Sequence, residues 1–341
     1  MAKGSSSLGK AYVAALAYSV IIGFSFVFVK FALRSASPMD LLAHRFTVSF
    51  AAANVLLLAG WGRARFTWAG VLNLLPIAVF YPSCFFMFQS WGLFYLSSSE
   101  AGIIQAAIPI LTMVLAAIFI RERSTGWQKL FILLSVCGVA FIVTMSGGEG
   151  GGGGWRLAGY CLMLISALSS AAYNVMARKL TQSHSVTEMT YLMMGVGFVV
   201  FNTIAVSQHL SAGTLAAYFE PFAEPRFIVS ILYLGLMSSL LTSYLTNYAL
   251  SRIQASQMSV FVNLSVVVTI GAGVIVLGEV LAWYHVAGAI LILGGVVGAN
   301  MRARKKCKAF IIVSWSCCLR RGNAGCRVES RQLFLLDVFV S

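Results

Sequence analysis

Apolar and polar positions along this chain form long blocks rather than short periods. Ten apolar runs, most of them about 20 residues long, are separated by short polar breaks. An α-helix needs about 20 apolar residues to cross the hydrocarbon core of a bilayer, where it satisfies its own backbone hydrogen bonds. The pattern therefore predicts an all-α integral membrane protein with ten transmembrane helices, at 11–33, 39–60, 69–92, 99–120, 128–146, 157–177, 187–207, 227–249, 256–278 and 281–301.

Composition and charge support this prediction. Hydrophobic residues make up 59% of the chain and charged residues only 10%, against roughly 25% charged residues in a soluble domain. The net charge of +14 comes mainly from Lys and Arg in loops that share a side with the N-terminus, as expected for cytoplasmic loops. We therefore predict a multi-pass protein of the plasma or inner membrane with both termini cytoplasmic. Its expected partners are the lipid bilayer and a small-molecule substrate, and not nucleic acid.

The cysteines predict neither a metal site nor a cofactor. Three of the seven lie in apolar runs, and the other four lie in the last 40 residues, at 307, 317, 318 and 326. None forms a CxxC spacing with a matching His, as a zinc site would require.

The chain contains an internal repeat. A Gly-rich stretch at 147–155 divides the ten runs five and five, and an offset of 157 residues pairs Glu122 with Glu279 and Gly138 with Gly295. Each half has an odd number of spans, so the two copies must insert in opposite orientations. We predict a first five-helix repeat at 11–146, a linker at 147–155, an inverted second repeat at 156–301, and a basic, Cys-rich tail at 302–341. Inverted repeats of this kind place a substrate site near the bilayer midplane.

Several sequence features resemble a known family. They are Lys30 near the end of the first run, SP and HRF at the start of the second, SSSEAGIIQAAIPILTMVLAAIFIRE at 97–122, and a Glu-then-Gly pattern in both halves. In these features the chain resembles the EamA-type transporters of the drug/metabolite transporter superfamily. The resemblance implies ten helices in two inverted repeats and passage of small metabolites by alternating access, often as export of amino acids or related compounds.

Two other classes of function stay open at this point. A membrane-embedded enzyme would need convergent nucleophile, acid and base groups or metal ligands at one depth, and the four His residues are scattered over separate regions. A non-transporting membrane scaffold is disfavoured only by analogy with duplicated transporters. We predict a secondary transporter, with the enzyme and the scaffold as alternatives.

Three ionisable residues inside the predicted spans are candidate substrate-binding residues: Lys30, His44 and Arg45. A charge at membrane depth costs about 2.5–3.5 kcal/mol on insertion scales and is a functional candidate by default. Lys30 either lines a cavity or extends to the outer headgroups. Arg45 keeps its proton, so it needs a cavity, a lipid phosphate or an acidic partner such as Asp40. His44 either relays a proton or has a structural role.

Polar and aromatic residues in other spans complete the candidate site. In the fourth run, Pro109 leaves the carbonyl of Gln105 without its helical donor, which predicts a kink. The counterpart of Pro109 in the ninth run is Val266, so the second half lacks this kink. The remaining candidates are Tyr81 in the third run, Tyr173 and Asn174 in the sixth, Tyr244 in the eighth and Asn263 in the ninth. Such residues form either an aromatic-walled pocket with a few polar groups or ordinary packing.

The last run carries a GxxxG pattern at Gly294 and Gly298. Small residues at this spacing let helices approach closely. The pattern predicts either packing within the monomer or a homodimer through these two glycines.

The tail mixes Cys, Arg and short apolar runs without a helical period, so we expect it to have no role in transport. Deleting residues 309–341 should leave the rate of substrate flux in proteoliposomes within about twofold of the full chain. A truncated protein that is monodisperse and folded but inactive would contradict this expectation.

Overall fold

The computed structural model describes residues 2–60, 68–119, 126–146, 153–253, 255–295 and 298, and this part of the chain forms helices and connecting turns without a β-strand. Most of the predicted linker at 147–155 and the whole of the tail at 302–341 lie outside the described residues.

Each predicted apolar run of the first half contains helix. The first and second runs form α1 (Ala2–Ala32) and α2 (Pro38–Leu58). The third run forms two helices, α3 (Trp68–Ala78) and α4 (Phe85–Tyr95), joined through η1 (Val79–Cys84), where the chain kinks at the extended backbone of Tyr81. The fourth run is divided into α5 (Ser98–Gln105) and α6 (Ile108–Phe119), and the fifth forms α7 (Gly126–Ser146).

The second half repeats this arrangement. The sixth and seventh runs form α8 (Gly153–Leu180) and α9 (Val186–Ala212), followed by two short 3-10 turns, η2 (Leu215–Tyr218) and η3 (Glu220–Ala223). The eighth run is one long helix with a π-helical centre, made of α10 (Pro225–Leu232), η4 (Tyr233–Leu241) and α11 (Thr242–Leu250). The ninth forms α12 (Ala255–Leu277), and a last helix spans Trp283–Gly295.

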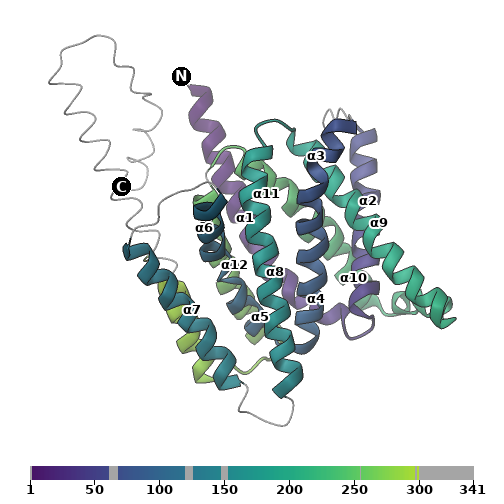
Figure 1. The fold of residues 1–341 in the computed structure, drawn as a ribbon. Coiled ribbons are helices and arrows are strands. Elements are labelled where there is room, and N and C mark those ends of the chain that lie inside the picture. Colours follow the sequence, from purple (N-terminus) through teal and green to yellow (C-terminus); the bar gives the residue numbers. More distant parts are fainter. Residues whose placement is uncertain are drawn as a thin grey trace.

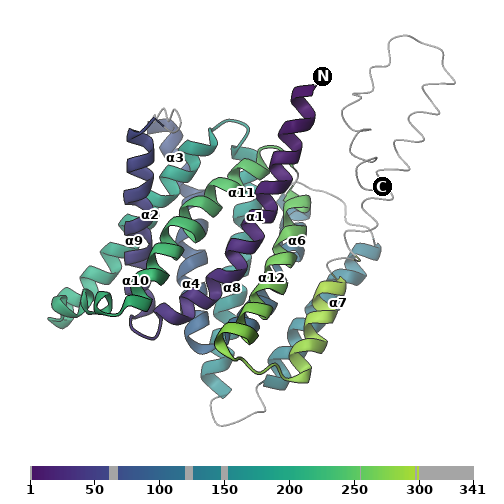
Figure 2. The same ribbon diagram turned by 180° about the vertical axis from the view of Figure 1, so that it is seen from behind.

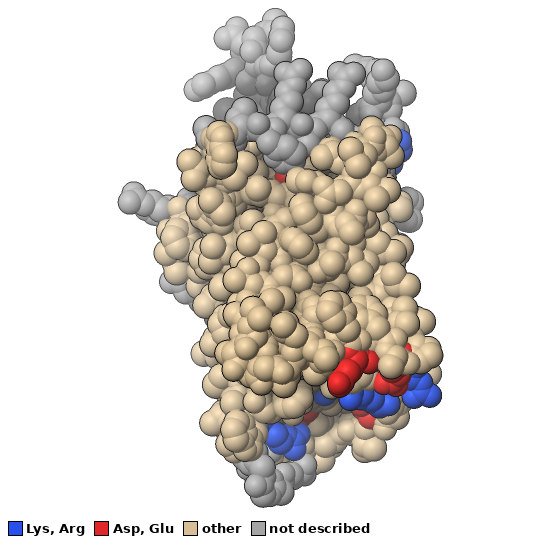
Figure 3. All heavy atoms as spheres, turned by 90° about the vertical axis from the view of Figure 1, so that its right-hand side faces the viewer, with Lys and Arg blue, Asp and Glu red and all other residues tan. Residues whose placement is uncertain are grey.

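Seven described helices are long and apolar enough to cross a membrane, and three shorter apolar helices occupy the remaining runs, at Val136–Met145, Phe261–Leu277 and Trp283–Gly295. Charged side chains on the face shown in Figure 3 gather mainly near one end, and a broad uncharged band lies beside them. Such a band suits contact with lipid tails. The protein is therefore an all-α membrane protein, and ten crossings remain the prediction from sequence.

Equivalent helices of the two halves run in opposite directions. In Figure 1, α1 descends from the N-terminus at the top, whereas its counterpart α8 rises from the bottom. The second helices, α2 and α9, are also antiparallel and pack against each other. The inverted orientation predicted from the odd number of runs is thus present in the fold.

The halves are interleaved rather than set side by side. The first helix of each half packs against the third and fourth runs of the other half: α1 contacts α11 and α12, and α8 contacts α4, α5 and α6 (Figures 1 and 2). Contacts within the bundle are therefore mostly contacts between halves, and polar groups of one half are available to the other.

The fourth run breaks where its proline predicts. α5 ends at Gln105, a turn at Ala106 and Ala107 follows, and Pro109 lies in the first turn of α6. The ninth run, with Val266 at the equivalent position, continues unbroken as α12. The expectation of a kink in one half only is confirmed.

The small residues of the last helix pack against α7. A Cβ atom on Gly288 would approach Ile142 to 2.2 Å, and a Cβ atom on Gly298 would approach Phe131 to the same distance. Gly294 has no atom within 4 Å of its Cβ position. Packing within the monomer therefore explains Gly298. A homodimer through Gly294 and Gly298 stays a prediction, and Gly294 is the one of the two glycines with free space beside it.

The contact between α2 and α9 depends on Gly197. A Cβ atom there would lie 2.4 Å from Cδ1 of Phe46, whose side chain is fully buried. We expect Gly197→Ala to destabilise the protein by about 1–3 kcal/mol, as overpacking of a core does. Thermal unfolding in detergent would measure the change. The control is Gly271→Ala, where nothing lies within 4 Å, and equal unfolding temperatures for the two variants would contradict the prediction.

Candidate functional site

Arg45 lies at the centre of the bundle and is only 1% exposed. Its Nε donates to Oγ of Ser239 at 2.6 Å, and Nη2 donates to Oγ and O of Ser238 at 3.0 and 3.3 Å. The guanidinium also lies over the ring of Phe86, 4.1 Å from its centroid. No carboxylate pairs with Arg45 within the described residues, and Asp40 instead contacts His209 at 3.0 Å. A buried cation is thus held by hydroxyls, a carbonyl and a ring.

Aromatic rings and one amide continue from Arg45 toward α8 and α11. The ring of Tyr81 is 5.1 Å from that of Phe86 and stacks on Tyr173 at 4.6 Å. The hydroxyl of Tyr173 donates to Oδ1 of Asn247 at 2.7 Å. We call five of these residues, all buried or nearly so, the central polar cluster. They are Arg45 of α2, Tyr81 of η1, Tyr173 of α8, Ser239 of η4 and Asn247 of α11.

One buried hydroxyl near this cluster, that of Ser90, has no hydrogen-bond partner among the described residues. Ser90 lies four residues after Phe86, about one helical turn, so it shares the face of α4 that carries this ring. The hydroxyl of Ser243, one turn after Ser239, interacts with the phenol of Tyr81. An unsatisfied buried hydroxyl costs about 1–3 kcal/mol, which is the situation expected where a ligand supplies the missing partner.

A groove approaches the cluster from the end of the bundle where α1 begins. It has a volume of about 560 Å³ and is lined by the end of α2, the start of α9 and the eighth run. Thr190 lines it, and the hydroxyl of Thr190 accepts a hydrogen bond from Nδ2 of Asn247 at 3.2 Å. Tyr244 lines the same groove and stacks on Tyr248. The groove, whose lining is mainly apolar, therefore adjoins the central polar cluster through the contact between Thr190 and Asn247.

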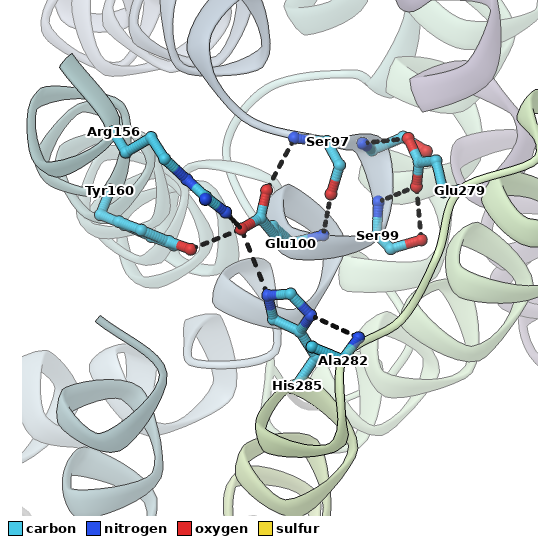
Figure 4. Close-up of polar contacts among 9 residues, drawn as sticks. Ser97, Ser99, Glu100, Arg156, Tyr160, Glu279, Ala282 and His285 are labelled. Atoms are coloured by element: carbon cyan, nitrogen blue, oxygen red, sulfur yellow. Dashed lines mark hydrogen bonds and ion pairs between the residues drawn. The ribbon is translucent and has the colours of Figure 1, made fainter. Parts of the chain in front are cut away.

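The opposite end is held by a carboxylate network around Glu100, shown in Figure 4. Oε1 of Glu100 accepts hydrogen bonds from Nη2 of Arg156 at 2.7 Å, from the hydroxyl of Tyr160 at 2.6 Å and from Nε2 of His285 at 3.2 Å. The backbone N–H of Ala282 donates to Nδ1 of His285. Nδ1 is therefore the acceptor, and Nε2 of the same ring carries the proton donated to Glu100. The network joins α5, α8 and the last helix.

A second carboxylate lies beside this network. Oε1 of Glu279 accepts from the backbone N–H of Ser98 at 2.7 Å, and Oε2 accepts from the N–H and the hydroxyl of Ser99 at 2.9 and 2.6 Å (Figure 4). Glu279 follows α12 in the second half, and α5 belongs to the first. A carboxylate of one half thus caps a helix of the other, where the partial positive charge of the N-terminus favours it.

His44 belongs to a packing contact at this same end. Its Nε2 donates to the carbonyl of Tyr218 in η2 at 2.9 Å, and its ring contacts those of Tyr218 and Phe222. Burial, followed by the nearby charge of Asp40, raises the pKa of Tyr218 to about 12. The phenol therefore stays protonated and donates to Asn202 at 3.0 Å. The segment of η2 and η3 is held over α2 by these contacts.

The structure brings together only some of the predicted site residues. Arg45, Tyr81 and Tyr173 meet in the central polar cluster, and Tyr244 lines the groove beside it. Lys30 and His44 lie toward the opposite end. The others are buried or half-buried elsewhere in the bundle: Gln105, bonded to Ser166; Pro109, after the helix break; Asn174, beside Tyr173; and Asn263, whose Oδ1 has no partner.

Sequence reasoning missed the serines and the carboxylate network. Ser238 and Ser239 gave no signal, because the π-helical turn that presents them is not visible in the pattern of apolar residues. Glu100 could have been identified, since Ser97 and Glu100 form a capping box three residues apart, a recognisable helix start.

Comparisons with known proteins agree with this architecture. The model of the EamA-like transporter family matches twice, at 9–144 and 157–301. The uncharacterized transporter YcxC of Bacillus subtilis (strain 168) is 55% identical over 298 residues, covering 87% of this chain and 95% of that protein. A probable amino-acid metabolite efflux pump of Salmonella typhimurium is 24% identical over 83% of this chain and 92% of its own length.

One solved structure superposes with a TM-score of 0.59 at 20% identity, over 88% of this chain and 98% of that one, and it supports the fold alone. The two family matches, by contrast, cover both halves, and the relative in Bacillus spans nearly the whole helical part. The chain therefore belongs to the EamA-like transporter family, and it is a multi-pass helical membrane transporter rather than an enzyme.

Proposed function

We propose that this protein is a secondary transporter that exports carboxylate-bearing small metabolites, of the amino-acid type, by alternating access. The relative in Salmonella whose name includes amino-acid metabolite efflux supports the substrate class. The proposed setting is the plasma or inner membrane with both termini cytoplasmic, as the distribution of Lys and Arg favours. The boundaries 11–146 and 156–301 are our proposal for the two repeats.

The observation that carries this proposal is the difference between the two ends of the bundle. At the end where α1 begins, a groove reaches Thr190, which is hydrogen-bonded to Asn247 of the central polar cluster. At the other end, carboxylates tie α5 to α8, to the loop after α12 and to the last helix. With the N-terminus inside, this difference supports a state that is closed to the outside and open toward the cytoplasm, which is one of the states that alternating access requires.

Arg45 supplies the chemistry for a carboxylate. Its Nη1 forms no hydrogen bond with any described residue, although Nε and Nη2 are engaged. Arginine keeps its charge when buried and binds carboxylates through two parallel N–H groups. The ring of Phe86 lies against the guanidinium, and the rings of Tyr81 and Tyr173 continue from Phe86. An anion with an apolar body matches this environment.

A non-transporting scaffold is the alternative, and a direct transport measurement separates the two. We expect the reconstituted protein to exchange labelled for unlabelled amino acids in counterflow assays, with the largest signal for a compound that has a free carboxylate. The panel should include nucleobases and sugar phosphates as other substrate classes. No exchange for any compound by a folded, correctly inserted protein would favour the scaffold.

Arg45→Gln should reduce flux of the carboxylate substrate by roughly 10–100-fold, because a charge-assisted hydrogen bond contributes about 1.5–3 kcal/mol. Arg45→Lys keeps the charge and should lose less. The matched control is Arg34→Gln, since Arg34 is exposed in the loop after α1. Size-exclusion profiles would verify folding of each variant. Equal flux in Arg45→Gln and Arg34→Gln would remove Arg45 from the site.

Lys30 has a different expected role. It lies half-buried near the outer end of α1, and the charges of Glu279 and then Glu100 act on it. Lys30→Gln should slow net export more than it weakens binding at the cytoplasmic side, because Lys30 is placed beside the exit. The measurement gives the maximal efflux rate and the half-saturating internal substrate concentration separately, and an unchanged maximal rate would contradict this role.

A further inference from the structure

The N-terminus of α5 is shaped to receive a carboxylate. Two backbone N–H groups, of Ser98 and Ser99, and the hydroxyl of Ser99 all donate to the single carboxylate of Glu279, at 2.6 to 2.9 Å. These donors follow directly from the helix start, whose first N–H groups have no partner inside the helix. The carboxylate that accepts their hydrogen bonds belongs to Glu279, in a loop about 180 residues away in the sequence.

A further donor at this place is unused. The hydroxyl of Ser98 is fully buried and has no hydrogen-bond partner. It points to the same spot as the others, since a Cβ atom on Gly273 would lie 2.7 Å from Oγ of Ser98, 2.6 Å from Oγ of Ser99 and 2.6 Å from Oε2 of Glu279. We call the N–H groups and hydroxyls of Ser98 and Ser99 the cradle. The cradle offers one more hydrogen-bond donor than Glu279 uses, so its donors exceed what that side chain needs.

The surroundings also favour an anion that can be exchanged. Lys30 forms no hydrogen bond or ion pair with any described residue, and its charge acts on the cradle through its interaction with Glu279. Glu279 itself lies in the turn between α12 and the last helix, directly after Gly278 at φ +67°. A carboxylate carried on a short connecting turn can leave the cradle without unfolding a helix.

We propose that the N-terminus of α5 is an exit site for the carboxylate of the transported compound, and that Glu279 occupies this site while the outer end is closed. The inference rests on the proposed export of carboxylates. When the outer end opens, the compound's carboxylate replaces that of Glu279 on the same donors, so no buried N–H group is left unpaired during the exchange. Arrival of substrate at the exit is thereby coupled to release of the contact that holds the two halves together.

Chemical rescue tests the site without relying on transport. Purified Glu279→Ala empties the cradle, and we expect its unfolding temperature to fall by roughly 4 °C relative to the unaltered protein, because several hydrogen bonds to a charged group are lost. Added formate should restore at least half of this fall. Formamide, which is neutral and of similar size to formate, should restore none, and chloride at equal ionic strength controls for salt.

Glu220→Ala is the matched control, because Glu220 is an exposed acid at the same end. If formate raises the unfolding temperature of Glu279→Ala and not that of Glu220→Ala or the unaltered protein, the cradle binds a free carboxylate. Equal shifts in all three proteins, or no fall on removing Glu279, would overturn the proposal. Glu279→Ser, which also removes the carboxylate and leaves the cradle empty, carries the same test if the alanine variant does not fold.

A double variant identifies the unused donor. Ser98→Ala in the Glu279→Ala background should weaken the formate effect severalfold, and an unchanged formate titration would exclude the Ser98 hydroxyl from the site. Counterflow of the unaltered protein is measured in parallel. Failure of every compound there would refute the proposed function while leaving the formate result intact, so the two failures are distinguishable.

Discussion

A side-chain hydroxyl inside a bilayer must donate to another protein group, such as a carbonyl of a neighbouring helix, because no water is present to accept its hydrogen bond. This requirement determines how the two halves of the protein meet. Side-chain hydroxyls reach carbonyls across the bundle in five contacts: Ser49 to Gly235, Ser166 to Phe85, Ser19 to Phe261, Thr269 to Gly23 and Tyr233 to Ile21. In each of them, donor and acceptor belong to opposite halves. The interleaved packing is therefore also a polar arrangement.

Both middle runs are irregular near their centres, at equivalent positions of the inverted repeat. The third run kinks in η1, where the backbone of Tyr81 is not helical, and the eighth contains the π-helical stretch η4. π-helical stretches are common at functional sites. The two halves supply their donors differently. Arg45 and Ser49 of α2 donate hydrogen bonds to backbone carbonyls of η4, whereas Ser166 of α8 donates to the carbonyl of Phe85, the residue that follows η1. Duplication gave one architecture, and the individual side chains made its centre asymmetric.

Sequence alone was sufficient for the outline of the fold. The ten apolar runs, the opposite orientation of the halves and the break before Pro109 all follow from run length, parity and proline chemistry. The contents of the site did not follow, because they depend on contacts between residues about 180 positions apart, such as Glu279 with Ser99. Arg45 could be selected as an intramembrane charge, but its partners could not, since nothing in the sequence marks Ser238 and Ser239 as the residues that face it.

The position of Arg45 links occupancy of the centre to the shape of the eighth run. Nε and Nη2 are already engaged by η4, and Nη1 is the nitrogen that forms no bond with a described residue. A carboxylate bound there would share the guanidinium with Ser238 and Ser239 rather than displace them. Because a carboxylate accepts more strongly than a hydroxyl, it would draw the guanidinium toward itself and weaken the support of the Ser238 carbonyl. The irregular segment would then rearrange when a substrate binds, with no further moving part required.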